Sequence, residues 1–583
     1  MSSQTPVTSL SPELQIRLKE RTEGFLNDII NTNLQTRFVQ EFDGMREFRD
    51  AIEPLKDRSA HEAWECYRDS VPLTNYDAYE PFISRFLAEP CREEDVKDLL
   101  SPGLPFFLAK SSGTSGKAAK LFPRYHFHIT NVAPGQSPFT TITCHIVSMT
   151  YLQVIDVLRN EGKSAKIIVT TSSSGKVRMH YGLGTEKDSE AIRATMHNTT
   201  SPVAVSHIRN YRSYLLMHAL FALAEEKLTA FRAGFGTVFL DLIMFMEAEW
   251  PTLLDSIENG TIPDFEDIHH VREYLEPRLL ANPSRAQKLR EIGDSKIEPG
   301  WLSRIWPELR QVNCIVTGVF ATTLPKLRYY LGPDLLIHSG SIAASEASSI
   351  GVSYSFTDHN LYKATTTDFI EYLDITEDSS PANLVPAWQL ETGRRYEIFL
   401  TTRNGLWRYC LRDVIEVAGF EPNDGLPLLR YVERLNRELR LSAALSLTET
   451  QIIEGILAGE KSLGKVNEFT VIIDERASLR RLGYFVELQD ALKPNAHLAL
   501  HEVLEELRRI NHNVNLHFGN KAIGAPTIRV LKPGTFSEYR QWRLGIARTA
   551  AGQTKVPVFV VDEATKGWLK ERVMCELLYP AED

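Results

Sequence analysis

Short strand-forming segments alternate with longer helical patterns along most of this chain. The apolar, β-branched segments are 166–171 (KIIVTT), 311–320 (QVNCIVTGVF), 334–340 (DLLIHSG) and 396–402 (YEIFLTT). The helical patterns between them lie at 207–229, 236–258 and 264–281. Such alternation is typical of an α/β fold and argues against a β-sandwich.

A second unit follows a change of pattern after about residue 440. Its strand-forming and helical segments are 469–474 (FTVIID), 484–488 (YFVEL), 498–510 (LALHEVLEELRRI) and 527–531 (TIRVL). They make a compact α+β unit of roughly 140 residues, an ordinary domain size. The whole chain, with 583 residues, is too long for a single hydrophobic core. We therefore expect a large N-terminal domain with mixed sheets and flanking helices over 1–433, a hinge at 434–445 and a small, mobile C-terminal domain over 446–583.

Composition indicates which classes of partner the protein is expected to lack and in which cellular compartment it is expected to act. A formal net charge of −10 on a chain of this length gives no reason to expect nucleic acid or an anionic membrane as partner. The N-terminus has no apolar leader segment, and the longest apolar run, 238–246, is too short to span a bilayer. The six cysteines form no CxxC pair, which favours a reducing, cytoplasmic setting. Without coiled-coil heptads, a monomer is expected.

Residues 109–123 read AKSSGTSGKAAKLFP, a hydroxyl- and glycine-rich stretch between apolar segments. Backbone N–H groups in such a loop can converge on an anion without obstruction by side chains. The hydroxyls and the ammonium that could join them are those of Ser111, Ser112, Thr114, Ser115 and Lys120. The spacing is not that of a Walker A loop. The stretch indicates either a loop that wraps a polyphosphate or a solvated surface loop.

Two carboxylates lie in contexts that suit a nucleotide. Glu346 is in the small-residue turn SGSIAASEASSIG, where it could hold Mg²⁺ or lie in the first turn of a helix. Asp413 lies between strand-forming runs in GLWRYCLRDVIEVAGF, where it could accept both hydroxyls of a ribose or pair with Arg408 or Arg412. These residues alone leave each pair of alternatives open.

The loop, the turn and the strand occur in the order found in the adenylate-forming superfamily. Their details resemble the acyl acid-amido synthetases of the Gretchen Hagen type, which also have microbial relatives. The family's SSGTS motif with its following Lys and Pro is matched by Ser111–Ser115, Lys120 and Pro123. Its YxSSE turn is matched by Ser345 and Glu346. Its YRxGDVVxVxGF strand is matched by Arg408, Tyr409, Asp413, Val414, Val417, Gly419 and Phe420. An FxxR motif is matched by YVER, which ends at Arg434. IGAPTIRVLKPGTF (523–536) is similar to IGPLEIRVVxxGTF, and GQTKVP (552–557) is similar to NQYKxPR.

The resemblance implies an adenylate-forming enzyme whose C-terminal domain turns about the hinge between two half-reactions. It implies a ligase that uses ATP and Mg²⁺ to adenylate a small carboxylic acid and then joins the acyl group to an amine, such as an amino acid. The implied catalytic residues are Lys555 and Glu346, with Mg²⁺ on Glu346. The implied nucleotide-binding residues are Ser111, Ser112, Gly113, Thr114, Ser115, Lys120, Ala344, Ser345, Glu346, Asp413, Phe420, Arg434 and Lys555.

The resemblance also implies an acyl-acid pocket between helices and the central sheet of the large domain. Its expected walls are 207–220, 171–178 and 316–327. The candidate substrate residues on them are Tyr211, Arg212, Tyr214, Ser174 and Val319. Ordinary packing on a helix face is the alternative for each of these side chains.

The sequence departs from the family pattern at several positions. Ile342 replaces the aromatic residue that stacks on adenine, and Cys410 and Arg412 stand where the family has Arg and Gly. Where many relatives carry a lysine after the hinge, this chain has Ser446 or Leu447. These differences bear more on the second half-reaction than on the first. Two alternatives therefore remain, namely thioester formation as in acyl-CoA ligases and nucleotide binding without turnover.

Overall fold

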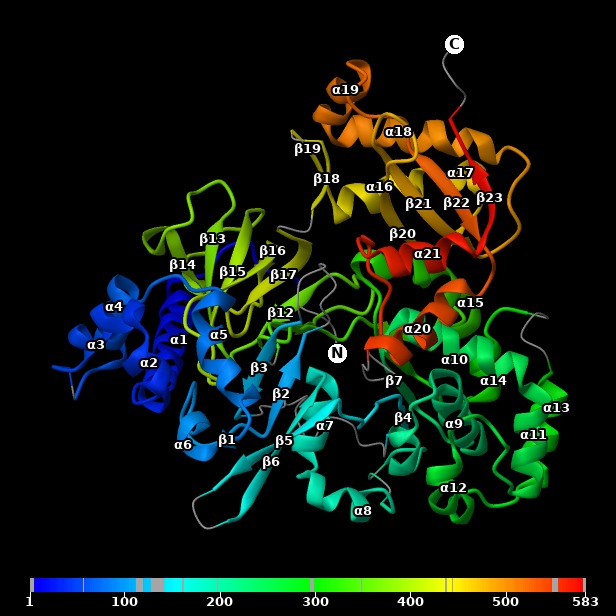
Figure 1. Cartoon of the computed structure of the whole chain (residues 1–583), viewed down its shortest axis with the longest axis horizontal. Coiled ribbons are helices and arrows are strands. Elements are labelled where there is room, and N and C mark those ends of the chain that lie inside the picture. Colours follow the sequence, from blue (N-terminus) through cyan, green and yellow to red (C-terminus); the bar gives the residue numbers. More distant parts are fainter. Residues whose placement is uncertain are drawn as a thin grey trace.

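The structure is a computed structural model that describes residues 5–55, 57–111, 119–126, 141–159, 162–194, 196, 198–293, 298–347, 349–435, 438–442, 444–547 and 554–579. It is a mixed α/β protein with a large N-terminal part and a smaller C-terminal part (Figure 1). The part up to Leu435 is called the large unit below, and the part from Glu438 the C-terminal unit. No helix in the described ranges is both long and apolar enough to cross a membrane.

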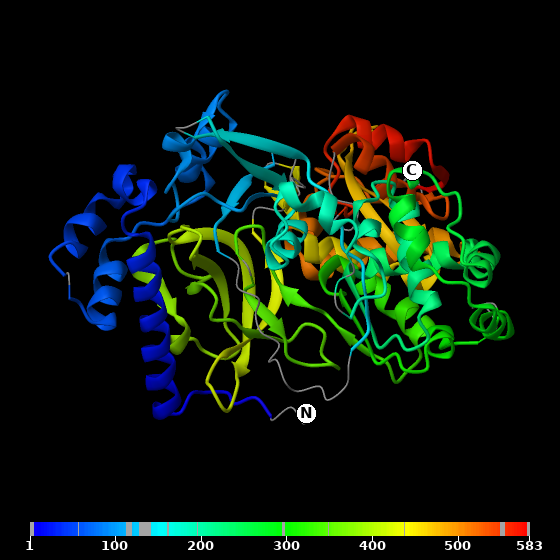
Figure 2. The same cartoon turned by 90° about the horizontal axis from the view of Figure 1, so that it is seen from below.

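A central antiparallel sheet carries the middle of the chain. Its strands, in spatial order, are β10 (Ser341–Ile342), β11 (Gly351–Ser353), β12 (Tyr362–Ala364), β17 (Pro427–Arg434), β16 (Tyr409–Phe420), β15 (Arg395–Thr401), β13 (Phe369–Asp374) and β14 (Leu384–Pro386). Fully and partly buried residues nearly alternate along β16, as expected for a strand that covers a core with one face. The N-terminal helices cover the β13 side of this sheet, and α1 (Pro12–Asn33) runs alongside it (Figure 2).

The remaining N-terminal helices are α2 (Arg37–Glu41), α3 (Arg46–Ile52), α4 (Ala60–Ser70) and α5 (Tyr76–Ile83). A mixed sheet lies next to them, with the strand order β1 (Cys91–Arg92), β5 (Gln153–Leu158), β6 (Ser164–Thr170), β2 (Phe107–Lys110) and β3 (Leu121–Arg124). One hydrophobic core joins these helices to the central and mixed sheets. Helix α7 (Ser172–His180) packs on β2 so closely that a Cβ at Gly175 would lie 2.2 Å from the ring of Phe107.

A second core surrounds a parallel sheet of β4 (Thr143–His145), β7 (Ala230–Phe235), β8 (Gln311–Ile315) and β9 (Leu336–His338). The helices around it are α9 (Tyr211–Ala224), α10 (Gly236–Ala248), α11 (Trp250–Asn259), α12 (His269–Leu275), α13 (Pro283–Ile292), α14 (Trp301–Ile305) and α15 (Leu324–Leu331). Helix α9 is buried over most of its length, because twelve of its residues contribute to the interior. It is therefore a core helix of the large unit.

The C-terminal unit has its own sheet, in the order β20 (Val466–Asp474), β21 (Arg481–Leu488), β22 (Thr527–Leu531) and β23 (Val573–Leu577). A hairpin of β18 (Glu438–Ser442) and β19 (Leu445–Thr448) precedes it. Its helices are α16 (Glu449–Ala458), α17 (Glu460–Leu463), α18 (Ala499–Ile510), α19 (His512–Gly519), α20 (Thr535–Ala547) and α21 (Glu563–Lys570). The two units interlock, because Leu544 of α20 belongs to the second core and Val319 of the large unit packs against the C-terminal core.

The expected fold class is confirmed, and some element bounds are corrected. The helix expected over 236–258 is two helices, because Pro251 takes a first-turn position that starts α11 anew. The strand expected over 311–320 ends at Ile315, and Gly318, with φ of +60°, begins a 3-10 helix. The hinge at 434–445 stays a prediction, although β17 ends at Arg434 and the hairpin that follows packs on the C-terminal core.

Candidate active site

Two carboxylates from separate motifs converge on one arginine. Arg434, at the end of β17, lies with Nε 3.5 Å from Oδ1 of Asp413 and with Nη2 3.8 Å from Oε1 of Glu346. Asp413 reaches this position because β16 and β17 are paired in the register that sets it opposite Arg434. Burial lowers the pKa of Arg434, but the two carboxylates outweigh that effect and raise it. The guanidinium therefore stays charged between them.

Glu346 lies in a turn that a buried arginine holds. Residues 343–347, between β10 and β11, are not helical and bend at Ser345 and Glu346, so the alternative that places Glu346 in the first turn of a helix is wrong. Arg124, at the end of β3, donates from Nη2 to the backbone oxygen of Ser345. Burial lowers the pKa of the Arg124 guanidinium, and the nearby Asp368 and Glu346 oppose this. The turn that carries Glu346 is thus tied to the strand that leaves the hydroxyl-rich loop.

The two ends of the hydroxyl-rich loop are held together by β2 and β3. The N–H of Ser111 donates to the oxygen of Lys120 (2.8 Å), and the N–H of Lys120 donates to Oγ of Ser111 (2.9 Å). The Lys120 ammonium lies 5.1 Å from the ring centre of Tyr76, at cation–π distance. The predicted binding residues Ser112, Gly113, Thr114 and Ser115 lie outside the described residues.

The base of this loop also contacts the strand of Asp413. Phe122 of β3 meets Tyr409 of β16 edge to face, with ring centres 6.0 Å apart. Together with the bond from Arg124 to Ser345, this contact joins β3, the turn of Glu346 and β16 into one packed assembly. Ile342 and Ala344 lie in or beside the first core at the same turn.

Arg412 has an unusual backbone conformation next to Asp413. Its φ is +69°, in the left-handed region that favours glycine and that costs another residue about 1 kcal/mol. Its guanidinium pairs with Glu397 at 3.3 Å, and the Cys410 thiol donates to the same Oε1 atom at 2.8 Å. Its backbone oxygen accepts the N–H of Leu435 at 2.7 Å. The side chain is thus occupied locally, while the backbone ties β16 to the end of β17.

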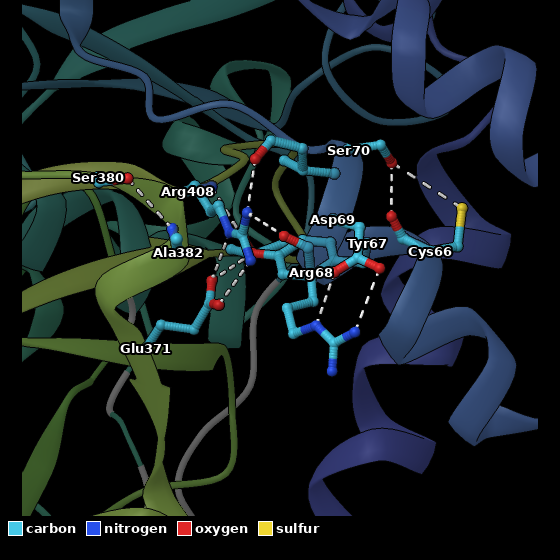
Figure 3. A network of polar contacts seen from close by, with 11 residues as sticks. Cys66, Tyr67, Arg68, Asp69, Ser70, Glu371, Ser380, Ala382 and Arg408 are labelled. Atoms are coloured by element: carbon cyan, nitrogen blue, oxygen red, sulfur yellow. Dashed lines mark hydrogen bonds and ion pairs between the residues drawn. The ribbon is translucent and has the colours of Figure 1, made fainter.

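Arg408 pairs with a different carboxylate, that of Glu371, and both side chains are buried (Figure 3). Its Nε and Nη2 both lie 2.9 Å from the carboxylate of Glu371 on β13, and its Nη1 donates to the backbone oxygen of Val71 at 2.6 Å. The hydroxyl of Tyr67, on α4, donates to Glu371 at 2.7 Å. Arg408 is wholly buried, so this network anchors the start of β16 on β13 and on the segment after α4. The sequence allows Arg408 as a partner of Asp413, but the structure pairs it with Glu371.

Two further predicted nucleotide residues come from other parts of the fold. Phe420 is buried in the first core at the far end of β16, and its N–H and oxygen bond with Val7. Phe420 lies seven positions beyond Asp413 along the strand, roughly 23 Å at the rise of a β-strand. Lys555 comes from the C-terminal unit, on the segment that continues to Val558, whose oxygen accepts the N–H of Val471 in β20. The roles of Phe420 and Lys555 stay predictions.

The candidate acyl-acid residues lie in separate surroundings. The Tyr211 hydroxyl donates to Oδ2 of Asp241 (2.7 Å), and Tyr214 is buried in the second core. Arg212 is partly exposed and pairs with Glu249 at 2.8 Å. Ser174 is buried in α7 and hydrogen-bonds Thr171, and Val319 faces the C-terminal core. Their substrate roles stay predictions.

Sequence reasoning missed the charged residues that surround Glu346. Arg124 follows the apolar pair of Phe122 and Pro123, and a basic residue at the end of a buried strand was the available signal. Lys176 lies in α7, where burial and the neighbouring Arg124 lower the pKa of its ammonium to about 7, against the attraction of Asp368. Two cations and two carboxylates thus gather between β3, α7 and the turn of Glu346.

Three domain profiles of one protein family match this chain. The profile of the GH3 family N-terminal domain matches residues 13–336, that of the central domain 362–434 and that of the C-terminal domain 452–564. The indole-3-acetic acid-amido synthetase GH3.8 of Oryza sativa subsp. indica is 25% identical, over 96% of this chain and 91% of its own length. The indole-3-acetic acid-amido synthetase GH3.15 of Arabidopsis thaliana is 24% identical, over 99% and 96%.

The fold agrees with a solved member of the same group. A structure described as GH3.15 acyl acid amido synthetase superposes with a TM-score of 0.77 at 21% identity, covering 98% of this chain and 96% of the other. The first matched profile alone spans more than half of the chain. This chain therefore belongs to the GH3 family.

Proposed function

We propose that this protein is an ATP-dependent ligase that adenylates a small carboxylic acid and transfers the acyl group to an amine, such as that of an amino acid. The observation that carries the proposal is the convergence of Glu346 and Asp413 on Arg434 beside the base of the hydroxyl-rich loop. The amido synthetase activity in the names of the relatives supports the same reaction class.

In the first half-reaction, a carboxylate oxygen of the acid attacks the α-phosphorus of ATP, and pyrophosphate leaves. The product is a mixed anhydride of the acid and AMP. Negative charge builds up on phosphate oxygens, so preorganised donors around them lower the barrier. In our proposal Asp413 accepts the ribose hydroxyls, while Ser111–Ser115, Lys120 and Lys555 surround the phosphates. Arg434 lies between the two carboxylates and holds their spacing.

The residues present fit a single Mg²⁺ that is bound mainly by phosphates. Mg²⁺ usually takes one or two protein carboxylates and completes its shell with phosphate and water. Glu346 can supply one, and no group of three or more metal-binding side chains occurs among the described residues. Such an ion would supply positive charge at the phosphates. Ala344 and Ser345 would shape the turn that presents Glu346.

In the second half-reaction, the amine nitrogen attacks the acyl carbon, AMP leaves with the former carboxylate oxygen, and the nitrogen loses a proton. AMP is a far better leaving group than oxide, which is why the acid must be adenylated first. We propose that the C-terminal unit turns about residues 434–445 between the two steps, which lets Lys555 serve the first and withdraw for the second. Tyr211, Arg212, Tyr214, Ser174 and Val319 stay candidates for substrate contacts.

We also propose that the protein acts in the cytoplasm as a monomer, without nucleic-acid or membrane partners. The net charge of −10 and the cysteine pattern motivate this proposal. Light scattering at several protein concentrations tests the monomer, and a mass that rises with concentration would contradict it.

The activity is tested with purified protein, ATP, Mg²⁺ and a panel of aliphatic, aromatic and indolic carboxylic acids. Pyrophosphate release is followed without acceptor, with an amino-acid mixture and with coenzyme A. The proposal expects acid-dependent pyrophosphate release and an amide product that needs the amino acids. Release stimulated by coenzyme A alone would identify a thioester-forming enzyme. Bound ATP without release for any acid would identify a binding protein without turnover.

A further inference from the structure

Helix α20 of the C-terminal unit lies against α9 and α10 of the large unit (Figure 1). Its Leu544 is buried in the core that surrounds the parallel sheet. Its Gln541 accepts the backbone N–H of Tyr211 at 2.6 Å. Tyr211 is the first residue of α9, and the first N–H groups of a helix have no partner within the helix. The C-terminal unit therefore caps a helix of the large unit.

One residue before this cap, Arg540 bridges the units. Its Nε and Nη2 lie 2.6 and 3.0 Å from the two oxygens of Asp241, in the large unit. Its Nη1 lies 2.9 Å from both oxygens of Glu468, in its own unit. The side chains of Arg540 and Asp241 are only 3% and 5% exposed. The Tyr211 hydroxyl also donates to Asp241, so the carboxylate is fully engaged.

A buried ion pair of this kind makes the contact selective. Separating the units exposes both charges to water again, but removing one partner while the units stay docked leaves an uncompensated buried charge. The guanidinium is also bidentate toward Asp241, which fixes direction as well as distance. Few other orientations of α20 against α10 would satisfy both geometries.

The surroundings of Arg540 carry more negative than positive charge. A cavity of about 20 Å³ adjoins it, and its charged lining residues are Asp241, Glu468, Glu487, Arg540 and Lys326. Burial raises the pKa of Glu468 to about 7 despite the opposing effect of Arg540. Glu487 also has a raised pKa through burial, although the N–H of Phe536 donates to it at 3.0 Å.

Two hydroxyls complete the lining. Thr237 and Ser537 are both more than nine-tenths buried, and their oxygens have no hydrogen-bond partner within the described part of the chain. Thr237 belongs to α10 and Ser537 to α20, so they come from the two sides of the interface. A cavity with these groups can take up a water or a proton.

We propose that Arg540 is a positioning residue whose contact with Asp241 holds the C-terminal unit in the orientation seen here, and that proton uptake by Glu468 strengthens this contact. A neutral Glu468 leaves Arg540 wholly to Asp241 and removes the repulsion between the two carboxylates. When the units separate, Glu468 becomes solvated and its pKa returns toward the ordinary value. The docked state therefore binds the extra proton, and docking weakens as pH rises through about 7.

Hydrogen exchange of the full-length protein tests the contact without any turnover. The amide of Tyr211 is the reporter, because its N–H is bonded across the interface. Arg540→Gln is expected to speed its exchange at least tenfold while amides of β21 keep their protection. The matched control is Arg572→Gln, since Arg572 pairs with Glu538 inside the C-terminal unit at 3.2 Å. Equal protection of Tyr211 in the two variants would overturn the proposal.

The proton dependence is tested with Glu468→Gln at pH 6 and pH 8, after correction for intrinsic exchange rates. Wild-type Tyr211 is expected to exchange several-fold faster at pH 8, and the variant equally slowly at both values. A variant that keeps the wild-type pH dependence would overturn this part. If Arg540→Gln loses protection in β21 as well, Asp241→Asn decides. It must speed the exchange of Tyr211 alone, and wild-type exchange there refutes the contact.

The consequence for catalysis rests on the proposed ligase function. The pH profile of amide formation should then lose its change near pH 7 in Glu468→Gln. A protein that binds ATP without turnover leaves the exchange result intact, so failure of the function and failure of the positioning role are distinguishable.

Discussion

Asp413 and Arg434 face each other across the β16–β17 ladder, with Oδ1 and Nε 3.5 Å apart. The same guanidinium reaches Glu346, which comes from a turn on another strand pair. One side chain thus sets the spacing of both carboxylates that the proposed chemistry needs. Arg434 also donates from Nη2 to the backbone oxygen of Leu411 at 3.1 Å, so its guanidinium, which β17 carries, is held in place by β16 as well.

Replacing Arg434 tests this arrangement. Arg434→Gln is expected to lower acid-dependent pyrophosphate release on the order of 10²-fold, because two carboxylates lose their shared cation. The control is Arg430→Gln on the same strand, whose pair with Asp358 at 2.7 Å lies near the surface. The assay is pyrophosphate release at saturating ATP. Similar rates for the two variants would contradict a role of Arg434 in the site.

Replacing Lys555 distinguishes an enzyme that adenylates acids from a protein that only binds nucleotide. If its ammonium supports the transferring phosphate, Lys555→Ala lowers pyrophosphate release by about 10²- to 10³-fold and leaves ATP binding nearly unchanged. Lys566→Ala, which removes an ammonium paired with Glu563 at 2.7 Å, is the control on the same unit. Rate and affinity are measured separately, by pyrophosphate release and by titration calorimetry. An unchanged rate would argue for nucleotide binding without adenylation.

The left-handed conformation of Arg412 predicts a difference between two small replacements. Arg412→Gly and Arg412→Ala both remove the pair with Glu397, but only glycine takes a φ of +69° without strain. The glycine variant should therefore be more stable than the alanine variant by about 1 kcal/mol. Urea unfolding followed by tryptophan fluorescence measures this difference. Equal midpoints would show that the strain is released elsewhere.

The buried pair of Arg408 and Glu371 predicts a large loss of stability. Glu371→Gln leaves the wholly buried guanidinium of Arg408 without its counter-charge, which typically costs about 3–5 kcal/mol. Glu391→Gln, which removes an exposed partner of Arg394, should cost less than about 1 kcal/mol. Both are compared by urea unfolding. A loss below 1 kcal/mol for Glu371→Gln would mean that the network of Tyr67 and the backbone oxygens suffices alone.

Lys176 predicts a dependence of stability on pH. Burial and Arg124 lower its pKa to about 7, so between pH 7 and the ordinary value for lysine the unfolded chain binds a proton that the folded chain does not. The free energy of unfolding should therefore rise with pH in this range through Lys176. The rise should be smaller in Lys176→Met, and it is measured by urea unfolding at pH 7, 8 and 9. Parallel curves for the two proteins would contradict the lowered pKa.

The sequence predicted continuous elements well and interrupted ones poorly. The strand expected at 527–531 is β22 with the same bounds. The strands expected at 469–474 and 396–402 correspond to β20 (Val466–Asp474) and β15 (Arg395–Thr401), with small differences at their ends. Runs of β-branched and aromatic residues carry their own signal. The single helix expected over 236–258 is wrong because a new helix starts next to Pro251, although the apolar pattern continues across this break between α10 and α11.

The candidate site was foreseen as separate motifs, but its ion pairs were not. Glu346, Asp413 and Arg434 are recognisable from sequence, whereas their convergence depends on the register of β16 on β17, which shifts at two irregularities. Such shifts in register are not visible in the spacing of apolar residues along the sequence. Arg124 and Lys176 were missed for a related reason, because a basic residue within a strand or helix gives no sign of which carboxylate will neutralise it.

The place of Leu544 bears on the order in which the protein can be completed during synthesis. The ribosome makes the parallel sheet and its helices early, yet one apolar side chain of their core arrives only with α20, near the end of the chain. Until then, that core has an open apolar site toward water. We expect nascent chains that end before residue 535 to recruit chaperones more strongly than the released protein, which ribosome-bound fragments of graded length can show.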